Sequence, residues 1–167
     1  RKTFDLLSKL QDKGKIGLIG CSNFSEEQLK TAINHADISI IQIPLNPLDG
    51  HPPDYLSTIC NEHQIKIVAY NVLAFGLLTG KFRKPQEFSV DDRRSRVDNF
   101  KKENFSKVYS KIEELEDTAK KLNMNLLEYT LNWVLSIENV VSAITGIKTS
   151  LQVSENIASL QNIKLKP

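Results

Sequence analysis

Short polar side chains follow an apolar run near the start of the chain. Residues 15–23 suit a strand buried on both faces, and Ser22 and Asn23 come at its end. Ser25 and Gln28 then have the spacing of a capping box at a helix start. Polar side chains beside the free amides of a helix N-terminus can hold an amide or an anion. The alternative is that these residues only form a turn and a helix cap.

Two further segments have the composition of anion sites. Residues 73–81, Leu-Ala-Phe-Gly-Leu-Leu-Thr-Gly-Lys, combine two glycines with a hydroxyl and a lysine, which suits a phosphate. Their spacing is not that of a Walker loop, so this signal is weak. Gly146, Lys148 and Thr149 form a second candidate at the start of the last helix, where a simple capped helix is the alternative.

Two strand residues could also contact a ligand. Gln42 is an amide within an aliphatic strand, so we expect it to have a partner, either a backbone group in the core or a ligand amide. Tyr70 ends another strand and could stack on a flat heterocycle or pack in the core.

The elements that must position these residues alternate along the chain. Apolar runs at residues 38–43, 65–70 and 140–144 predict three more strands, with amphipathic helices between them. Four βα units in a row indicate a parallel α/β fold, either an open doubly wound sheet or a (β/α) barrel. The polar residues gather at the carboxyl ends of the strands, where barrel enzymes keep their chemistry.

One segment breaks this alternation. Residues 82–104 are polar, contain several arginines and show no steady period, so we predict a functional lid or a disordered loop. Asn125 and Glu128 are predicted to cap the helix that follows them. The last helix, which Thr149 and Gln152 cap, is predicted to bury Val153, Ile157 and Leu160.

Composition limits the possible partners. The chain has 167 residues, 40% hydrophobic and 25% charged, which fits one soluble domain over residues 1–167 without an internal boundary. A net charge of +2 argues against nucleic acid and anionic membranes as partners, and no apolar run reaches the length of a membrane span. Cys21 and Cys60 have no framework or metal spacing, so we expect reduced thiols in a cytoplasmic protein and no metal site.

Several motifs in register resemble the second half of an aldo-keto reductase over essentially the whole chain. They are Gly-Cys-Ser-Asn-Phe at 20–24, Gln42 with Asn46, residues 69–81, Leu-Asn-Trp-Val-Leu at 131–135, and residues 146–156 ending in Ser-Glu-Asn. The resemblance implies a (β/α)₈ TIM barrel, of which this chain is the C-terminal half. It also implies extended binding of NADP(H) and hydride transfer to a small aldehyde or ketone.

The resemblance assigns cofactor contacts residue by residue. The groups around the nicotinamide carboxamide correspond to Ser22, Asn23 and Gln42, and the ring stacked under the nicotinamide corresponds to Tyr70. The pyrophosphate belt corresponds to Asn71, Leu73, Gly76, Leu77, Thr79 and Lys81. The adenosine end corresponds to Gly146, Lys148, Gln152, Glu155 and Asn156, where a cation near a 2′-phosphate favours NADP over NAD. Arg93 lies in a loop, 91–96, that resembles a cofactor clamp or gate.

The sequence departs from the family pattern in places. Asn71 and Val72 stand where many members have Ser-Pro, and Gly146 and Gln152 stand where some have Lys and Arg. Pro44 and Leu45 precede Asn46 where an aromatic residue is more usual.

The family's acid–base group, a tyrosine with a lysine, an aspartate and a histidine, belongs to the first four strands. This chain begins at the helix before the fifth, so we predict no catalytic residue in it and expect the chain alone to be inactive. None of Tyr55, Tyr109 or Tyr129 occupies a matching motif.

A half-barrel would leave the strand edges at 15–23 and 140–144 open, and we expect an N-terminal half-barrel or a second copy to cover them. Little chain follows Leu160 to close over a pocket. A non-catalytic, nucleotide-sensing subunit is the alternative function, and an intact acid–base set in the parent's first half would argue against it. A flavodoxin-like rearrangement of the four units is a third possibility.

Overall fold

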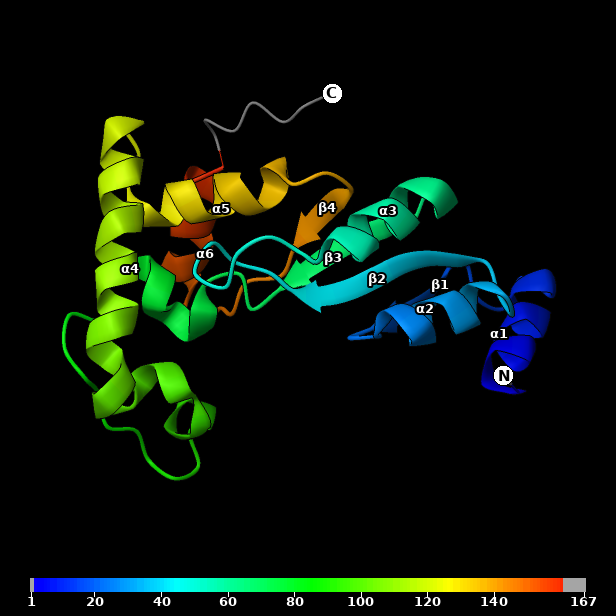
Figure 1. The fold of residues 1–167 in the computed structure, drawn as a ribbon, viewed down its shortest axis with the longest axis horizontal. Coiled ribbons are helices and arrows are strands. Elements are labelled where there is room, and N and C mark those ends of the chain that lie inside the picture. Colours follow the sequence, from blue (N-terminus) through cyan, green and yellow to red (C-terminus); the bar gives the residue numbers. More distant parts are fainter. Residues whose placement is uncertain (1, 161–167) are drawn as a thin grey trace.

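The computed structural model describes residues 2–160 and alternates strands with helices (Figure 1). The helices are α1 (Lys2–Asp12), α2 (Glu26–Ile33), α3 (Asp54–His63), α4 (Lys102–Lys121), α5 (Leu126–Ser136) and α6 (Ser150–Ala158). The strands are β1 (Ile19–Ser22), β2 (Ile38–Pro44), β3 (Lys66–Tyr70) and β4 (Val140–Ala143). Short 3₁₀ helices η1 (Ala74–Thr79), η2 (Arg93–Arg96) and η3 (Asp98–Phe100) lie between β3 and α4.

The strands form one parallel sheet in the order β1-β2-β3-β4. Ser22 is in register with Gln42, and Pro44 with Tyr70, so the carboxyl ends of the first three strands meet at one edge. The order runs straight through the chain and never reverses. The prediction of a parallel α/β fold is therefore confirmed. A doubly wound sheet and the flavodoxin-like arrangement both need a reversal of strand order, which the described strands do not show.

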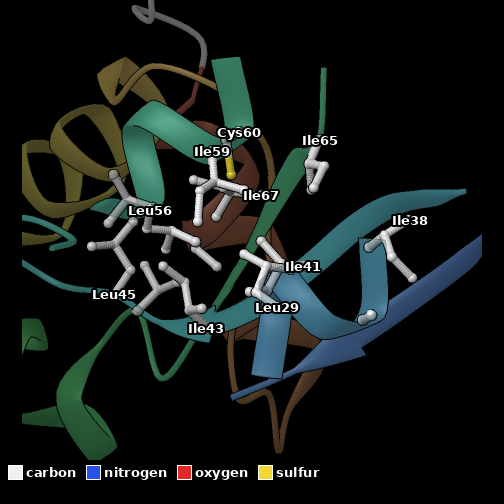
Figure 2. Packing of buried hydrophobic residues seen from close by; sticks show 14 of the residues in the cluster. Leu29, Ile38, Ile41, Ile43, Leu45, Leu56, Ile59, Cys60, Ile65 and Ile67 are labelled. Carbon is white, nitrogen blue, oxygen red and sulfur yellow. The ribbon is translucent and has the colours of Figure 1, made fainter. Parts of the chain in front are cut away.

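The main core lies between the sheet and helices α2, α3 and α5, and Figure 2 labels residues of α2, of α3 and in or next to the strands. Ile41 and Ile67 project from the middle strands and are fully buried, together with Leu29 of α2 and Leu56 of α3. Burying such a side chain stabilises the fold by about 1.5–3 kcal/mol. The strand ends are therefore carried on a rigid base.

A second core holds η1 against the C-terminal helices. Leu77 and Leu78 of η1 are fully buried in a cluster with Phe105 and Ile112 of α4 and Leu126 of α5. Figure 1 shows α4 standing across the end of the molecule opposite α1, so this core lies far from the N-terminal helix.

The segment at residues 82–104 is folded, which corrects the expectation of a disordered loop, whereas a role as a lid stays a prediction. Phe82, Phe88 and Phe100 meet edge to face, with centroids 4.8 Å apart for Phe88 and Phe100 and 5.3 Å for Phe82 and Phe100. These aromatic contacts join residues up to 18 positions apart, so no local period predicts them.

Three predicted helix caps are confirmed. Ser25 with Gln28 and Asn125 with Glu128 form complete capping boxes, and the Thr149 hydroxyl accepts the Gln152 N–H at 3.3 Å. Capping needs only residues three apart in sequence, which is why the sequence predicts it well.

The two ends of the sheet differ from expectation. β1 is shorter than the predicted strand at 15–23, and Leu18 is 65% exposed instead of buried. Val153, Ile157 and Leu160 of the last helix segment are likewise exposed. Leu18 directly precedes the edge strand β1, and the other three residues lie on or just after α6, which follows the edge strand β4. Within residues 2–160 no strand pairs with the outer edge of β1 or β4.

Of the helices that the structure describes, none has both the length and the apolar character needed to cross a membrane. No cluster of three or more metal-ligating side chains occurs in the same residues.

Candidate functional site

Four predicted site residues meet at the carboxyl edge of β1, β2 and β3. The backbone N–H of Asn23 donates to the Gln42 carbonyl at 3.0 Å, and Ser22 lies beside Gln42 in register. The Tyr70 hydroxyl donates to Asn23 Oδ1 at 3.0 Å. This bond joins the end of β3 to the end of β1 and fixes the orientation of the tyrosine ring.

Gln42 lacks the backbone partner that was one of its two predicted partners, and a ligand amide stays the other prediction. Its side chain is half-buried, and its amide makes no hydrogen bond to another described residue. Gln42 lies near the carboxyl end of the inner strand β2. Both the donor and the acceptor of Gln42 are therefore available to a ligand.

The chain after β3 folds into a tight turn. Asn71, Ala74 and Phe75 have positive φ, at 52°, 46° and 57°, and Gly76 follows at 95°. Asn71 Oδ1 accepts the Phe75 N–H at 3.1 Å, and the Thr79 hydroxyl donates to the Gly76 carbonyl at 2.7 Å. Non-glycine residues with positive φ have a strained backbone, and they are common at functional sites.

This turn forms one wall of a cavity of about 1590 Å³. Segments 70–76, 79–81, 92–94, 123–128 and 144–159 contribute to its lining. The predicted site residues that line it are Tyr70, Asn71, Leu73, Gly76, Thr79, Lys81, Arg93, Gly146, Lys148, Gln152, Glu155 and Asn156. The cavity thus gathers predicted pyrophosphate and adenosine contacts, which are up to 85 positions apart.

The remaining predicted residues lie outside this lining. Ser22, Asn23 and Gln42 occupy the neighbouring strand ends and reach the cavity through Tyr70. Leu77 is fully buried in the second core, so its side chain anchors η1, and Leu77 does not line the cavity. Its place in the pyrophosphate belt stays a prediction.

Two backbone amides at the cavity have no internal partner. Val72 and Leu73 are buried and line the cavity, and neither N–H has an acceptor within residues 2–160. Buried amides without a partner are rare, and successive free amides in a turn form an anion site. These donors fit a bound phosphate.

Three cations at the cavity are free of ion pairs with any described residue: Lys81, Arg93 and Lys148. Lys81 Nζ lies 4.9 Å from the Phe82 ring centre, and the Arg93 guanidinium lies 5.7 Å from that of Phe75. Contacts of this kind hold the cations near aromatic rings and leave their charge available.

Two further arginines, Arg94 of the 91–96 loop and Arg83 before it, have structural partners. Arg94 Nε donates to Asp92 Oδ1 at 2.9 Å and lies 4.2 Å from the Phe88 ring centre. The hydrogen bonds from Arg94 hold the pKa of Asp92 well below its usual range. Arg83 forms an ion pair with Glu116 at 2.7 Å, and the Glu116 carboxylate balances its positive charge.

Helix α6 supplies the far end of the cavity. The Lys148 N–H donates to Gln152 Oε1 at 2.7 Å, and Asn156 Nδ2 donates to the Thr145 hydroxyl at 3.1 Å. Gln152 therefore uses its acceptor for the helix start, and Lys148 alone supplies positive charge among the predicted residues of this helix region.

Sequence reasoning missed part of the site. Asn125 and Glu128 at the start of α5 line the cavity, although they had been interpreted only as a helix cap. Asn46 is fully buried and donates to the Asn71 carbonyl at 3.3 Å. Its place in the family motif with Gln42 was the available signal.

Residues 1–167 match the family model described as "Aldo/keto reductase family". The chain belongs to the aldo/keto reductase family. Its relatives in this family are oxidoreductases, and the resemblance drawn from the motifs is confirmed at the level of the family.

Curated aldo/keto reductases match along nearly the whole chain. The NADH-specific methylglyoxal reductase of Escherichia coli is 27% identical, over 98% of this chain and 49% of its own length. The aldo-keto reductase yakc of Schizosaccharomyces pombe, whose name specifies NADP(+), is 29% identical over 96% of this chain and 48% of its own. The chain therefore spans about half the length of the curated relatives it matches.

Solved structures agree with the fold. The glycerol dehydrogenase of Gluconobacter oxydans is similar with a TM-score of 0.74 and 28% identity, over 99% of this chain and 55% of that protein. The parallel sheet of this aldo/keto reductase chain thus resembles part of its relatives' barrel, and which half it represents stays a prediction.

Proposed function

We propose that this chain is the C-terminal, cofactor-binding half of an NADP(H)-dependent aldo-keto reductase that reduces an aldehyde or ketone to an alcohol. The chain would act as one unit over residues 1–167 and work in the cytoplasm, in keeping with its two free thiols. The observation that carries the proposal is the cavity, which combines free amides, unpaired cations and a tyrosine ring at the end of a parallel strand.

The cofactor's reactive ring would lie at the strand ends. Gln42, Asn23 and Ser22 present amide and hydroxyl groups that match a carboxamide, which both donates and accepts hydrogen bonds. Tyr70 would support the ring from below, with its hydroxyl held by Asn23. When bound, the cofactor supplies the hydride, and these residues decide which face of the ring meets the substrate.

The pyrophosphate would lie along the turn after β3. The Val72 and Leu73 amides would donate to its oxygens, with Lys81 and Arg93 supplying positive charge. Gly76 allows the backbone to pass close to the ligand.

The adenosine end would lie against α6. Lys148 would meet a 2′-phosphate, which supports a preference for NADP(H) over NAD(H). Gln152 adds no charge, because its amide is neutral, and its carbonyl already accepts the Lys148 N–H.

The proton donor would come from outside this chain. Of the described tyrosines, Tyr70 alone lines the cavity, and its hydroxyl is engaged with Asn23. Reduction of a carbonyl develops negative charge on oxygen, which an acid must neutralise. We propose that an N-terminal half-barrel or a second copy brings this acid and covers the open edges of β1 and β4.

Direct binding tests the proposal. Isothermal titration of the chain with NADPH and with NADH should show tighter binding of NADPH. Lys148→Ala should weaken the binding of NADPH by at least about tenfold, since it removes a charge-assisted bond. The affinity for NADH should stay nearly unchanged. Lys9→Ala is the matched control, because it removes the same charge from exposed Lys9 of α1, outside the cavity.

The native mass completes the experiment. A mass of twice 18.9 kDa, or a partner of similar size, would support completion of the barrel. An 18.9 kDa species that binds neither cofactor would refute the cofactor-binding role of the chain.

A further inference from the structure

Asn46 is a buried polar residue whose side chain is fully engaged. Its Oδ1 accepts the N–H groups of Leu48 and Asp49, each at 3.1 Å. Its Nδ2 donates to Asp49 Oδ2 at 2.8 Å and to the Asn71 carbonyl at 3.3 Å. The bond to Asn71 is the one that leaves its own loop and reaches the turn after β3.

That turn has a costly backbone conformation. Ala74 and Phe75 are consecutive non-glycine residues with positive φ, and Asn71 is a third. Such residues persist only when their surroundings determine their conformation. The turn therefore depends on specific contacts.

Asn71 makes several of these contacts. Its carbonyl accepts the Ala74 N–H at 2.9 Å as well as the Asn46 amide. Its side-chain Oδ1 accepts the Phe75 N–H at 3.1 Å. One residue thus caps both strained positions, and Asn46 fixes the carbonyl of that residue.

We propose that Asn46 is a positioning residue for the cofactor. By holding the Asn71 carbonyl, it keeps the turn at 71–76 in the shape that lines the cavity, without touching the ligand itself. The inference rests on the proposed function for its ligand. The turn's dependence on Asn46 can be tested without that ligand.

Asn46→Asp is the sharpest variant. It is made in the Asp49→Ala background, so that the new carboxylate does not face the Asp49 carboxylate. It keeps the size and the acceptor oxygen of the side chain but replaces the Nδ2 donor, which removes the bond to Asn71. Asp49→Ala is the matched control, because it removes the other partner of Nδ2 and leaves the bond to Asn71 in place. Asn71→Gly is a second variant, which tolerates positive φ, keeps the carbonyl and removes the bond to Phe75.

Hydrogen exchange measures the turn directly. The amides of Ala74 and Phe75 should be protected in the unchanged chain and in Asp49→Ala. In Asn46→Asp both amides should exchange at least about tenfold faster. In Asn71→Gly the amide of Phe75 should show the same increase. Equal protection in all four proteins would overturn the inference, whether or not the chain binds a cofactor.

Ligand binding separates positioning from general damage. NADPH should bind about tenfold more weakly to Asn46→Asp and to Asn71→Gly, whereas adenosine 2′,5′-bisphosphate, which lacks the pyrophosphate, should bind unchanged. Equal weakening of both ligands would indicate a general structural role and overturn the inference. An unchanged chain that binds neither ligand would refute the proposed function, while the exchange result would still decide the role of Asn46.

Discussion

Gly76 allows the close approach on which the cavity wall depends, and we predict that Gly76→Ala weakens both the fold and cofactor binding. Its φ is +95°, which side-chain-bearing residues rarely adopt. A Cβ at this position would lie 3.3 Å from Lys81 Cε and 3.3 Å from Phe82 Cε2. The new methyl group would therefore press on a predicted phosphate-binding lysine.

The cost has two parts. Holding alanine in the left-handed region costs about 1–2 kcal/mol. Crowding adds about 1 kcal/mol, the low end for small-to-large changes, because the lysine chain can move. We expect the free energy of unfolding to fall by about 2–3 kcal/mol in total. Moving Lys81 should also weaken NADPH binding by about tenfold.

Gly14→Ala separates the two parts. Gly14 also has a positive φ, +65°, but nothing lies within 4 Å of its Cβ position, and it lies outside the cavity lining. This variant should show the backbone cost alone and bind NADPH normally. Urea unfolding followed by the fluorescence of Trp133, the single tryptophan, gives the stabilities. The reasoning is wrong if Gly76→Ala is no less stable than Gly14→Ala, or if both bind NADPH equally well.

Three further predictions concern the fold. Thr130→Val should raise the free energy of unfolding by about 1 kcal/mol, because the buried hydroxyl has no partner among the described residues; a loss of stability in urea would contradict this. Arg94 lowers the pKa of Asp92, so the stability this pair contributes is present above the unfolded pKa of about 3.9 and is lost as pH falls toward the folded value. Acid unfolding of Asp92→Asn should lack this part of the pH dependence, and identical acid profiles would show that the pair contributes nothing. Burial raises the pKa of Cys21 and Cys60 to about 11, so iodoacetamide at pH 8 should label both thiols slowly until urea unfolds the chain, and rapid native labelling would argue against their burial.

Features that depend on near neighbours in the sequence were predicted well. The capping boxes at Ser25 and Asn125 need only residues three apart, and the four apolar runs each gave a parallel strand. The family motifs keep their order along the chain, so the sequence also indicated the family.

Burial at the edges was predicted less well, because it depends on what packs from elsewhere. The apolar character of Leu18 and Ile157 predicts burial, yet Leu18, just before the edge strand β1, and Ile157, on α6, are both exposed. A similar difference occurs within one motif, where Leu73 lines the cavity and Leu77 is enclosed by α4 and α5. Leucines four positions apart look alike in sequence, and only their distant neighbours distinguish them.

By itself, the sequence determined the local elements and, through the family motifs, predicted which residues would contact a nicotinamide nucleotide. Only the tertiary structure decided that Lys81 and Lys148 line one cavity and that Asn46 holds the turn at Asn71. The physical reason is separation along the chain. A cap is formed by backbone and side-chain groups within one helical turn, whereas these contacts form only when the parallel strands have brought separate loops to the same edge of the sheet.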